Sequence, residues 1–78
     1  MDPFVGLIQI FAFPFAPRGW APCNGQLLQI DEFDVLFNLI GTTYGGDGTT
    51  TFALPKLAPL GPNGPGYYIS LFGQAPTK

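Results

Sequence analysis

The sequence predicts a small, mainly β fold that carries one short α-helix. Two apolar runs, at residues 5–13 and 67–72, have the composition of strands. Only the segment after Asp31 places apolar residues at helical spacing. Domains usually contain at least about 50 residues, so we expect residues 1–78 to form a single domain.

Residues 5–13 are predicted to form the first strand. Side chains alternate between the two faces of a strand, so every second residue shares a face. Both faces are mainly apolar, as in a strand covered on both sides, and Gln9 needs a hydrogen-bond partner if it is buried. Pro14 and Pro17 end the run, because proline cannot donate to a β-ladder. One face holds Val5, Leu7, Gln9, Phe11 and Phe13, and the other holds Gly6, Ile8, Ile10 and Ala12.

Residues 17–26 are predicted to contain a turn, a short strand and a second turn. Asn24-Gly25 is a strong hairpin signal, because both central residues of a type I′ turn need a positive φ. Residues 26–30 would then return as the paired strand. Pro22 restricts the first arm to an edge strand or an irregular one.

The helix is predicted to begin after Asp31, which is a suitable N-cap. Asp34 follows in a shortened version of the capping box, and the acidic first turn, with Glu32, suits the positive end of the helix dipole. Gly41 is expected to close the helix as a left-handed C′ residue. A helix of about ten residues is marginal alone, so it must dock on the strands. The apolar stripe available for docking is Phe33, Leu36, Phe37 and Ile40.

The second half of the chain is predicted to be extended or irregular. Residues 42–49 are a glycine-rich loop, and residues 50–54 resume an extended pattern that Pro55 stops. Residues 58–66 are an irregular connector. The terminal strand lies in residues 67–73, which are rich in β-favouring residues.

Size and composition predict a protein that needs a partner. A small chain buries too little apolar surface to offset its ordering entropy, so it usually needs a disulfide, a metal or a partner subunit. Cys23 is the only cysteine and there is no histidine, which leaves association. Only 10% of residues are charged while 15% are aromatic, and we expect part of this apolar surface to face copies of the same chain.

Several classes of function are excluded by the same composition. The net charge of −2, with Arg18, Lys56 and Lys78 as the only cations, argues against nucleic-acid binding. No apolar stretch approaches the roughly 20 residues of a membrane span. The start, Met1-Asp2-Pro3, lacks the basic region of a secretory signal. We therefore expect no signal peptide, and if the protein works outside a cell, it must leave by lysis or by a route that the sequence does not show.

Several unusual motifs occur in one order along the chain. The first motif, before the predicted helix, is Phe15-Ala-Pro-Arg-Gly-Trp-Ala-Pro-Cys-Asn-Gly-Gln-Leu-Leu. The next two motifs along the chain are Leu36-Phe-Asn-Leu-Ile-Gly-Thr-Thr-Tyr-Gly-Gly-Asp-Gly and Thr51-Phe-Ala-Leu-Pro. Over residues 4–57 this order closely resembles the phage tail collar domain of short tail fibres and of bacterial proteins called microcystin-dependent. The ending, Tyr67-Tyr-Ile-Ser-Leu-Phe-Gly, looks like the terminal strand of compact bacterial members.

The resemblance implies a tail-collar-like fold and a trimeric or fibre-like structural part, extracellular or associated with a virion. It also implies other tail or fibre proteins as partners. The chain departs from the family after Leu54-Pro55, where Lys56-Leu-Ala-Pro replaces the expected Asp or Asn, Leu and glycine-arginine stretch. The large receptor-reading region of true tail fibres is absent, which leaves assembly as the main inherited role.

The residues do not predict an enzyme, a metal or a cofactor. Cys23 has no histidine to activate it, and such a cysteine is usually a small buried residue. The carboxylates of Asp31, Glu32 and Asp34 are explained by the helix N-terminus. The glycine-rich loop lacks the lysine of a phosphate loop, and Asp47 alone does not make a calcium site.

The function predicted is a non-enzymatic structural subunit that assembles with copies of itself as a trimer or filament. Strand addition at apolar edges would supply the contacts. Phe11→Asp or Ile69→Asp is then expected to give soluble but unassembled protein. The candidate contact residues are Phe4, Leu7, Phe11, Phe13, Tyr67, Ile69 and Leu71.

The alternative is a surface-recognition module that binds a glycan or a cell-surface receptor. Arg18 and Trp20 are two residues apart on a short strand, so they share a face and can form a cation–π pair. Tyr44, beside the glycine-rich loop, is the third candidate ligand residue. The sequence leaves both functions open.

Overall fold

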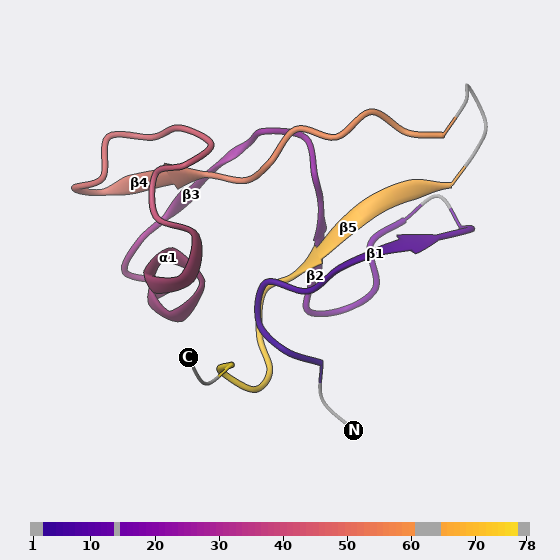
Figure 1. Cartoon of the computed structure of the whole chain (residues 1–78), viewed down its shortest axis with the longest axis horizontal. Coiled ribbons are helices and arrows are strands. Elements are labelled where there is room, and N and C mark those ends of the chain that lie inside the picture. The colour runs from indigo at the N-terminus through magenta and orange to yellow at the C-terminus, as the bar shows by residue number, and fades with distance from the viewer. Residues whose placement is uncertain (1–2, 14, 61–64, 77–78) are drawn as a thin grey trace.

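The computed structural model describes residues 3–13, 15–60 and 65–76, and in these ranges the chain is mainly β (Figure 1). One antiparallel sheet has the strand order β1-β5-β2, and a second sheet pairs β3 with β4. The predicted class, mainly β with one short helix, is confirmed. The elements in chain order are β1 (Ile8–Phe11), β2 (Trp20–Pro22), β3 (Leu27–Gln29), α1 (Asp34–Ile40), β4 (Thr51–Ala53) and β5 (Gly66–Ser70).

β1 is shorter than predicted, because a β-bulge precedes it. The Gly6 N–H donates to the Ser70 C=O, and the Ser70 N–H donates to the Leu7 C=O, both at 2.9 Å. Gly6 and Leu7 therefore both lie opposite the single residue Ser70, as in a bulge. The first bulge residue is Gly6, with φ 88°. Because of the extra residue, the Val5 side chain points into the core. Strict alternation had predicted that Val5 shares a face with Leu7.

The predicted Asn24-Gly25 hairpin is wrong. β2 pairs with β5, and β3 pairs with β4, so the two arms do not pair with each other. Only Gly25 of the two central residues has a positive φ. The Gln26 side chain closes this turn instead: its amide donates to the Pro22 C=O at 2.9 Å, and its Oε1 accepts the Asn24 N–H at 3.1 Å. Because local side-chain bonds hold the turn, its flanking strands are free to join different sheets.

α1 begins later than the predicted cap at Asp31. Phe33 precedes the helix, and no side chain caps its N-terminus. The Gln29 C=O accepts the Phe33 N–H at 3.2 Å, so residues 30–33 form a turn that replaces the first predicted helical turn. Gly41 ends the helix with φ 58°, the positive φ that was predicted, although its ψ of −144° is not left-handed helical.

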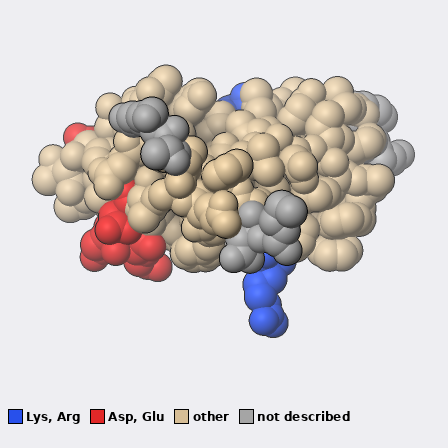
Figure 2. All heavy atoms as spheres, turned by 60° about the horizontal axis from the view of Figure 1, so that its bottom comes forward, with Lys and Arg blue, Asp and Glu red and all other residues tan. Residues whose placement is uncertain are grey.

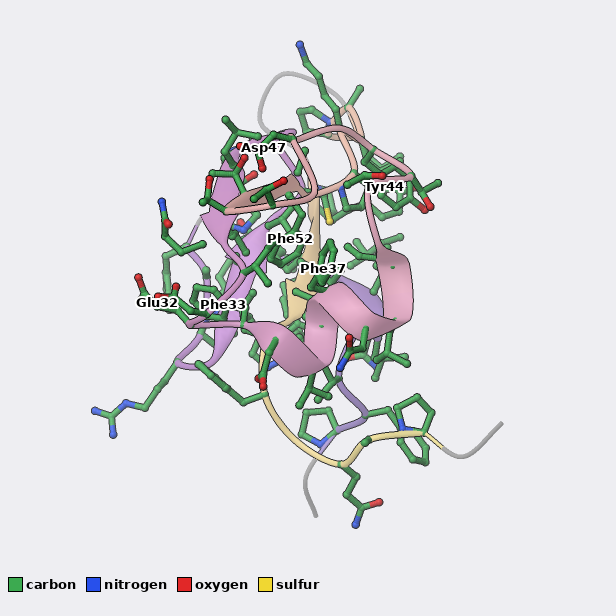
Figure 3. All side chains as sticks on the ribbon, turned by 90° about the vertical axis from the view of Figure 1, so that its left-hand side faces the viewer. Glu32, Phe33, Phe37, Tyr44, Asp47 and Phe52 are labelled. Carbon is green, nitrogen blue, oxygen red and sulfur yellow. The ribbon has the colours of Figure 1, made fainter. Side chains whose placement is uncertain are left out.

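The core lies between the three-stranded sheet, α1 and β4. Leu36, on the predicted apolar stripe of α1, is fully buried. Figure 3 shows Phe37 pointing from the helix toward Phe52 of β4, and their ring centroids are 5.5 Å apart. The buried cluster consists of Val5, Ala21, Cys23, Leu36, Phe52, Leu54 and Ile69.

The glycine-rich loop is the tight turn that was predicted, with positive φ at Gly45, Gly46 and Gly48. Asp47 organises it, because its Oδ1 accepts the backbone N–H groups of Thr49, Thr50 and Thr51 at 2.8, 2.9 and 3.0 Å. These hydrogen bonds hold the pKa of Asp47 well below its ordinary value, and the bond from the Thr51 N–H has the largest effect. The loop therefore binds the ionised carboxylate.

Some predictions fall outside the described residues. These are Pro14 at the end of the first predicted strand, residues 61–64 of the connector, and both ends of the single domain, residues 1–2 and 77–78. The terminal strand is present as β5 and is shorter than residues 67–73 at its C-terminal end. Among the described residues, no helix has the length and apolar character that crossing a membrane requires.

Candidate self-association surface

The strand β1 lies at one edge of the three-stranded sheet and is exposed on both faces. Ile8 and Ile10 are 37% and 48% exposed, although they share a face with the buried Ile69. In Figure 1 the ends of β1 and β5 extend away from α1 and from the second sheet, which explains this exposure. Gln9, on the other face, is exposed as well. The strand thus carries apolar side chains that the chain itself leaves uncovered.

The outer edge of β1 also presents backbone groups. In an antiparallel pair, the N–H and C=O of alternate residues point toward the partner strand. The Leu7 C=O accepts from Ser70 on β5, so the backbone groups of Gln9 and Phe11 also face β5. The N–H and C=O of Ile8 and Ile10 consequently face outward. β1 contains no proline and no charged residue, the usual devices that protect an edge strand.

The opposite edge of this sheet, β2, is protected. The outward N–H of Trp20 donates to the Pro17 C=O at 3.0 Å within the preceding turn. Pro22 has no N–H, and its C=O accepts the side-chain amide of Gln26 at 2.9 Å. The two edges of the same sheet therefore differ: β1 can accept a further strand, whereas β2 has no outward N–H free to donate to one.

An aromatic cluster covers the second face of this sheet. The Phe11 ring stands edge-on to Trp20, with centroids 5.0 Å apart, and also packs against Tyr68 at 5.5 Å. Phe13 stacks on Phe11, and Phe15 packs on Phe13. Phe13 and Phe15 are themselves exposed, so the cluster continues to the protein surface.

The predicted contact residues divide into three groups. Phe4, Leu7 and Phe13 are exposed, and Phe11, Tyr67 and Leu71 are half-buried. Ile69 is 1% exposed and belongs to the core, so its side chain is not available to another copy. Ile69→Asp would place a carboxylate in the core. We therefore expect this variant to lose its fold, and not to give the soluble, unassembled protein that the sequence predicted.

Sequence reasoning missed Ile8, Ile10 and Phe15 as exposed apolar residues. The alternation of the first strand placed both isoleucines correctly on one face. The inference that both faces were covered was wrong, because the sheet extends beyond the helix (Figure 1). The length of that overhang depends on the pairing of β1 with β5, which local sequence does not encode.

The candidate ligand residues are only partly brought together. Arg18 and Trp20 line one shallow pocket of about 270 Å³, together with Phe72 and the backbone around Gly73. Tyr44 lies beyond the C-terminal end of α1 and is not part of that pocket (Figure 3). The Trp20 ring packs against Phe11, which gives it a structural role. Binding of a glycan or receptor through these residues stays a prediction.

Reactive and charged groups are sparse on the described part of the chain. Cys23 is a free thiol in the core, and burial raises its pKa, which disfavours the nucleophilic thiolate. No group of three or more His, Cys, Asp or Glu side chains that could hold a metal occurs among the described residues. Figure 2 shows a face that is mostly uncharged, with acidic and basic residues confined to small areas.

Comparison with known proteins assigns the family. A family model described as the phage tail collar domain matches residues 6–60, more than two thirds of the chain. The match spans β1, β2, β3, α1 and β4, and so includes the edge strand and the glycine-rich loop. Among curated proteins, none matches this sequence.

Proposed function

The chain belongs to the phage tail collar domain family, and we propose that it is a non-enzymatic structural subunit that self-assembles into a trimer or filament. Membership of this family indicates a structural role in a phage tail fibre, with other tail components as partners and the virion as its location. The proposed assembly is a fibre-like appendage outside the cytoplasm, built from copies of this chain.

The observation that carries the proposal is the amount of apolar surface left exposed near one edge. Of the described residues, twelve large hydrophobic side chains are exposed. Half of these occur within residues 4–15, in and around β1: Phe4, Leu7, Ile8, Ile10, Phe13 and Phe15. This concentration of exposed apolar side chains on one short segment favours an interaction site there.

The total accessible area supports the same proposal. A compact monomer of 8.4 kDa is expected to expose about 4,600 Å². This chain exposes 5170 Å², and its dimensions of 36 × 30 × 21 Å describe a flattened molecule. An accessible area above that of a compact monomer is consistent with a subunit that covers part of its surface with neighbouring copies.

The small size of the chain makes subunit contacts a large part of its surface. A specific interface covers about 800 Å² per partner, roughly 15% of the 5170 Å² of this chain. Subunits of a ring or a filament each make two such contacts, which together would cover about a third of it. With only 10% charged residues, like-charge repulsion between neighbouring copies is weak.

The proposal is tested by the mass and shape of the purified protein. Light scattering over a hundredfold range of concentration should give multiples of 8.4 kDa, and negative-stain electron microscopy should show discrete trimers or regular filaments. A circular dichroism spectrum typical of β structure establishes that the sample is folded. A folded chain that keeps a mass of 8.4 kDa throughout the range would contradict the proposal.

A further inference from the structure

We infer that β1 of one copy pairs with β1 of a second copy, antiparallel and across a two-fold axis, so that two three-stranded sheets become one continuous sheet. The inference rests on the proposed self-assembly and names one of its contacts. It follows from the unequal protection of the two sheet edges, from the backbone groups that face outward, and from the sequence of β1 itself.

The unequal edges determine where a sheet-to-sheet contact forms. On β2, the outward N–H of Trp20 and C=O of Pro22 already have partners within the chain, at 3.0 and 2.9 Å. On β1, the outward groups of Ile8 and Ile10 have no neighbouring strand among the described residues. A β1-to-β2 contact is therefore disfavoured, and the free edge of β1 is available to pair with its own equivalent.

The outward groups also determine the register. Antiparallel strands exchange hydrogen bonds between residues whose N–H and C=O groups both face the partner. In one register, Ile8 of each copy lies opposite Ile10 of the other. This register uses all the outward groups of the strand and forms about four hydrogen bonds. A shift by two residues would recruit Ala12, which lies beyond β1. The register centred on Gln9 is therefore favoured.

The side chains of β1 are self-complementary in this register. On one face, Ile8 of each copy contacts Ile10 of the other, and both residues are exposed in the single chain. On the other face, Gln9 meets Gln9 of the second copy at the axis, where two amides can donate to and accept from each other. Leu7 and Phe11 form an apolar pair beyond it. No charged residue opposes another, because β1 contains none.

The symmetry of this contact bears on the form of the assembly. A two-fold contact uses the same surface on both copies and closes after two, whereas a ring of three needs two different surfaces. The pairing therefore favours a filament whose repeating unit is a pair, joined to the next pair through another surface. The second sheet, which lies away from the free end of β1 in Figure 1, offers such a surface, because Leu27 of β3 is 60% exposed.

Two opposite charge substitutions at Gln9 test the axis. Gln9→Lys alone and Gln9→Glu alone each place like charges directly opposite, and we expect pair formation to weaken by about fivefold or more in sedimentation velocity. An equimolar mixture places Lys opposite Glu and should restore pairing at least to the wild-type level. Asn38→Lys and Asn38→Glu, on the exposed side of α1, make the same changes in net charge and should leave pairing unchanged.

Cysteine cross-linking tests the register independently. Gln9→Cys is expected to form a disulfide-linked dimer under mild oxidation, because directly opposed residues that are not hydrogen-bonded to each other have Cα atoms about 4.5 Å apart. Ile8→Cys should not form this dimer, since residue 8 of the second copy is offset from it by two residues along the strand. The native Cys23 is buried and does not compete.

The outcomes separate this inference from the proposed function. Two results would overturn the β1 contact while self-assembly stands. In the first, the wild-type chain assembles and neither single Gln9 charge variant changes the assembly. In the second, Ile8→Cys cross-links in place of Gln9→Cys. If the folded wild-type chain is monomeric at all concentrations, the proposed function fails and the inference fails with it. Restored pairing in the charge mixture, with cross-linking at Gln9→Cys, supports both.

Discussion

Single residues hold the loop between α1 and β4 in its tight turn. The carboxylate of Asp47 accepts three consecutive backbone N–H groups, and the adjacent Gly46 brings the loop against β4. A Cβ on Gly46 would lie 2.7 Å from the Thr51 C=O oxygen and closer still to the Phe52 Cα, both of which are backbone atoms. The position tolerates only glycine, because of this close approach and because φ is 94°.

We therefore predict that Gly46→Ala destabilises the fold strongly. The added methyl group must displace the backbone of β4, so the free energy of unfolding should fall by about 2 kcal/mol or more. Gly41→Ala is the matched control: its φ of 58° and ψ of −144° also disfavour a side chain, but a Cβ there meets nothing within 4 Å, so only backbone strain of about 1–3 kcal/mol is expected, less than the loss for Gly46→Ala. Urea unfolding measures both, and equal losses would show that the close approach is unimportant.

The elements show which features local sequence predicts and which depend on distant partners. The alternation of β1, the apolar stripe of α1 and the positive φ of Gly41 were predicted, because each depends on nearby residues. The Asn24-Gly25 hairpin was wrong, because the Gln26 side chain closes that turn and distant strands supply the partners. The bulge at Gly6 and the exposed edge of β1 follow from pairing with β5, about sixty residues away.

At the same scale, α1 is expected to depend on a single buried side chain. The helix has seven residues and no side-chain cap, so it is not stable without tertiary packing. Leu36 is 0% exposed, and Leu36→Ala should lower the free energy of unfolding by about 2–5 kcal/mol. Val35, the preceding residue, is 42% exposed, so Val35→Ala should change it by only about 0.5 kcal/mol. Comparable losses in thermal unfolding of the two variants would contradict docking of α1 through Leu36.

At the scale of the whole molecule, stability and assembly are expected to be linked. A chain of 78 residues with an excess of exposed apolar surface has little stability of its own, and any contact that only the folded chain makes adds to it by mass action. The contact at β1 hydrogen-bonds backbone groups that the unfolded chain does not hold in register, so it stabilises the folded state specifically. Folding then becomes more favourable as the concentration of subunits rises.

The melting temperature of the wild-type chain should therefore rise with protein concentration, by about 3–5 °C for each tenfold increase. The Gln9→Lys variant is the control, because its exposed side chain leaves the fold intact while like charges weaken the pair. Its melting temperature should match that of the wild type in dilute solution and rise less as concentration increases. Scanning calorimetry over a hundredfold range measures both curves. A wild-type melting temperature that stays constant over this range would mean that the chain folds without its partner, and that exposed apolar surface alone does not drive assembly.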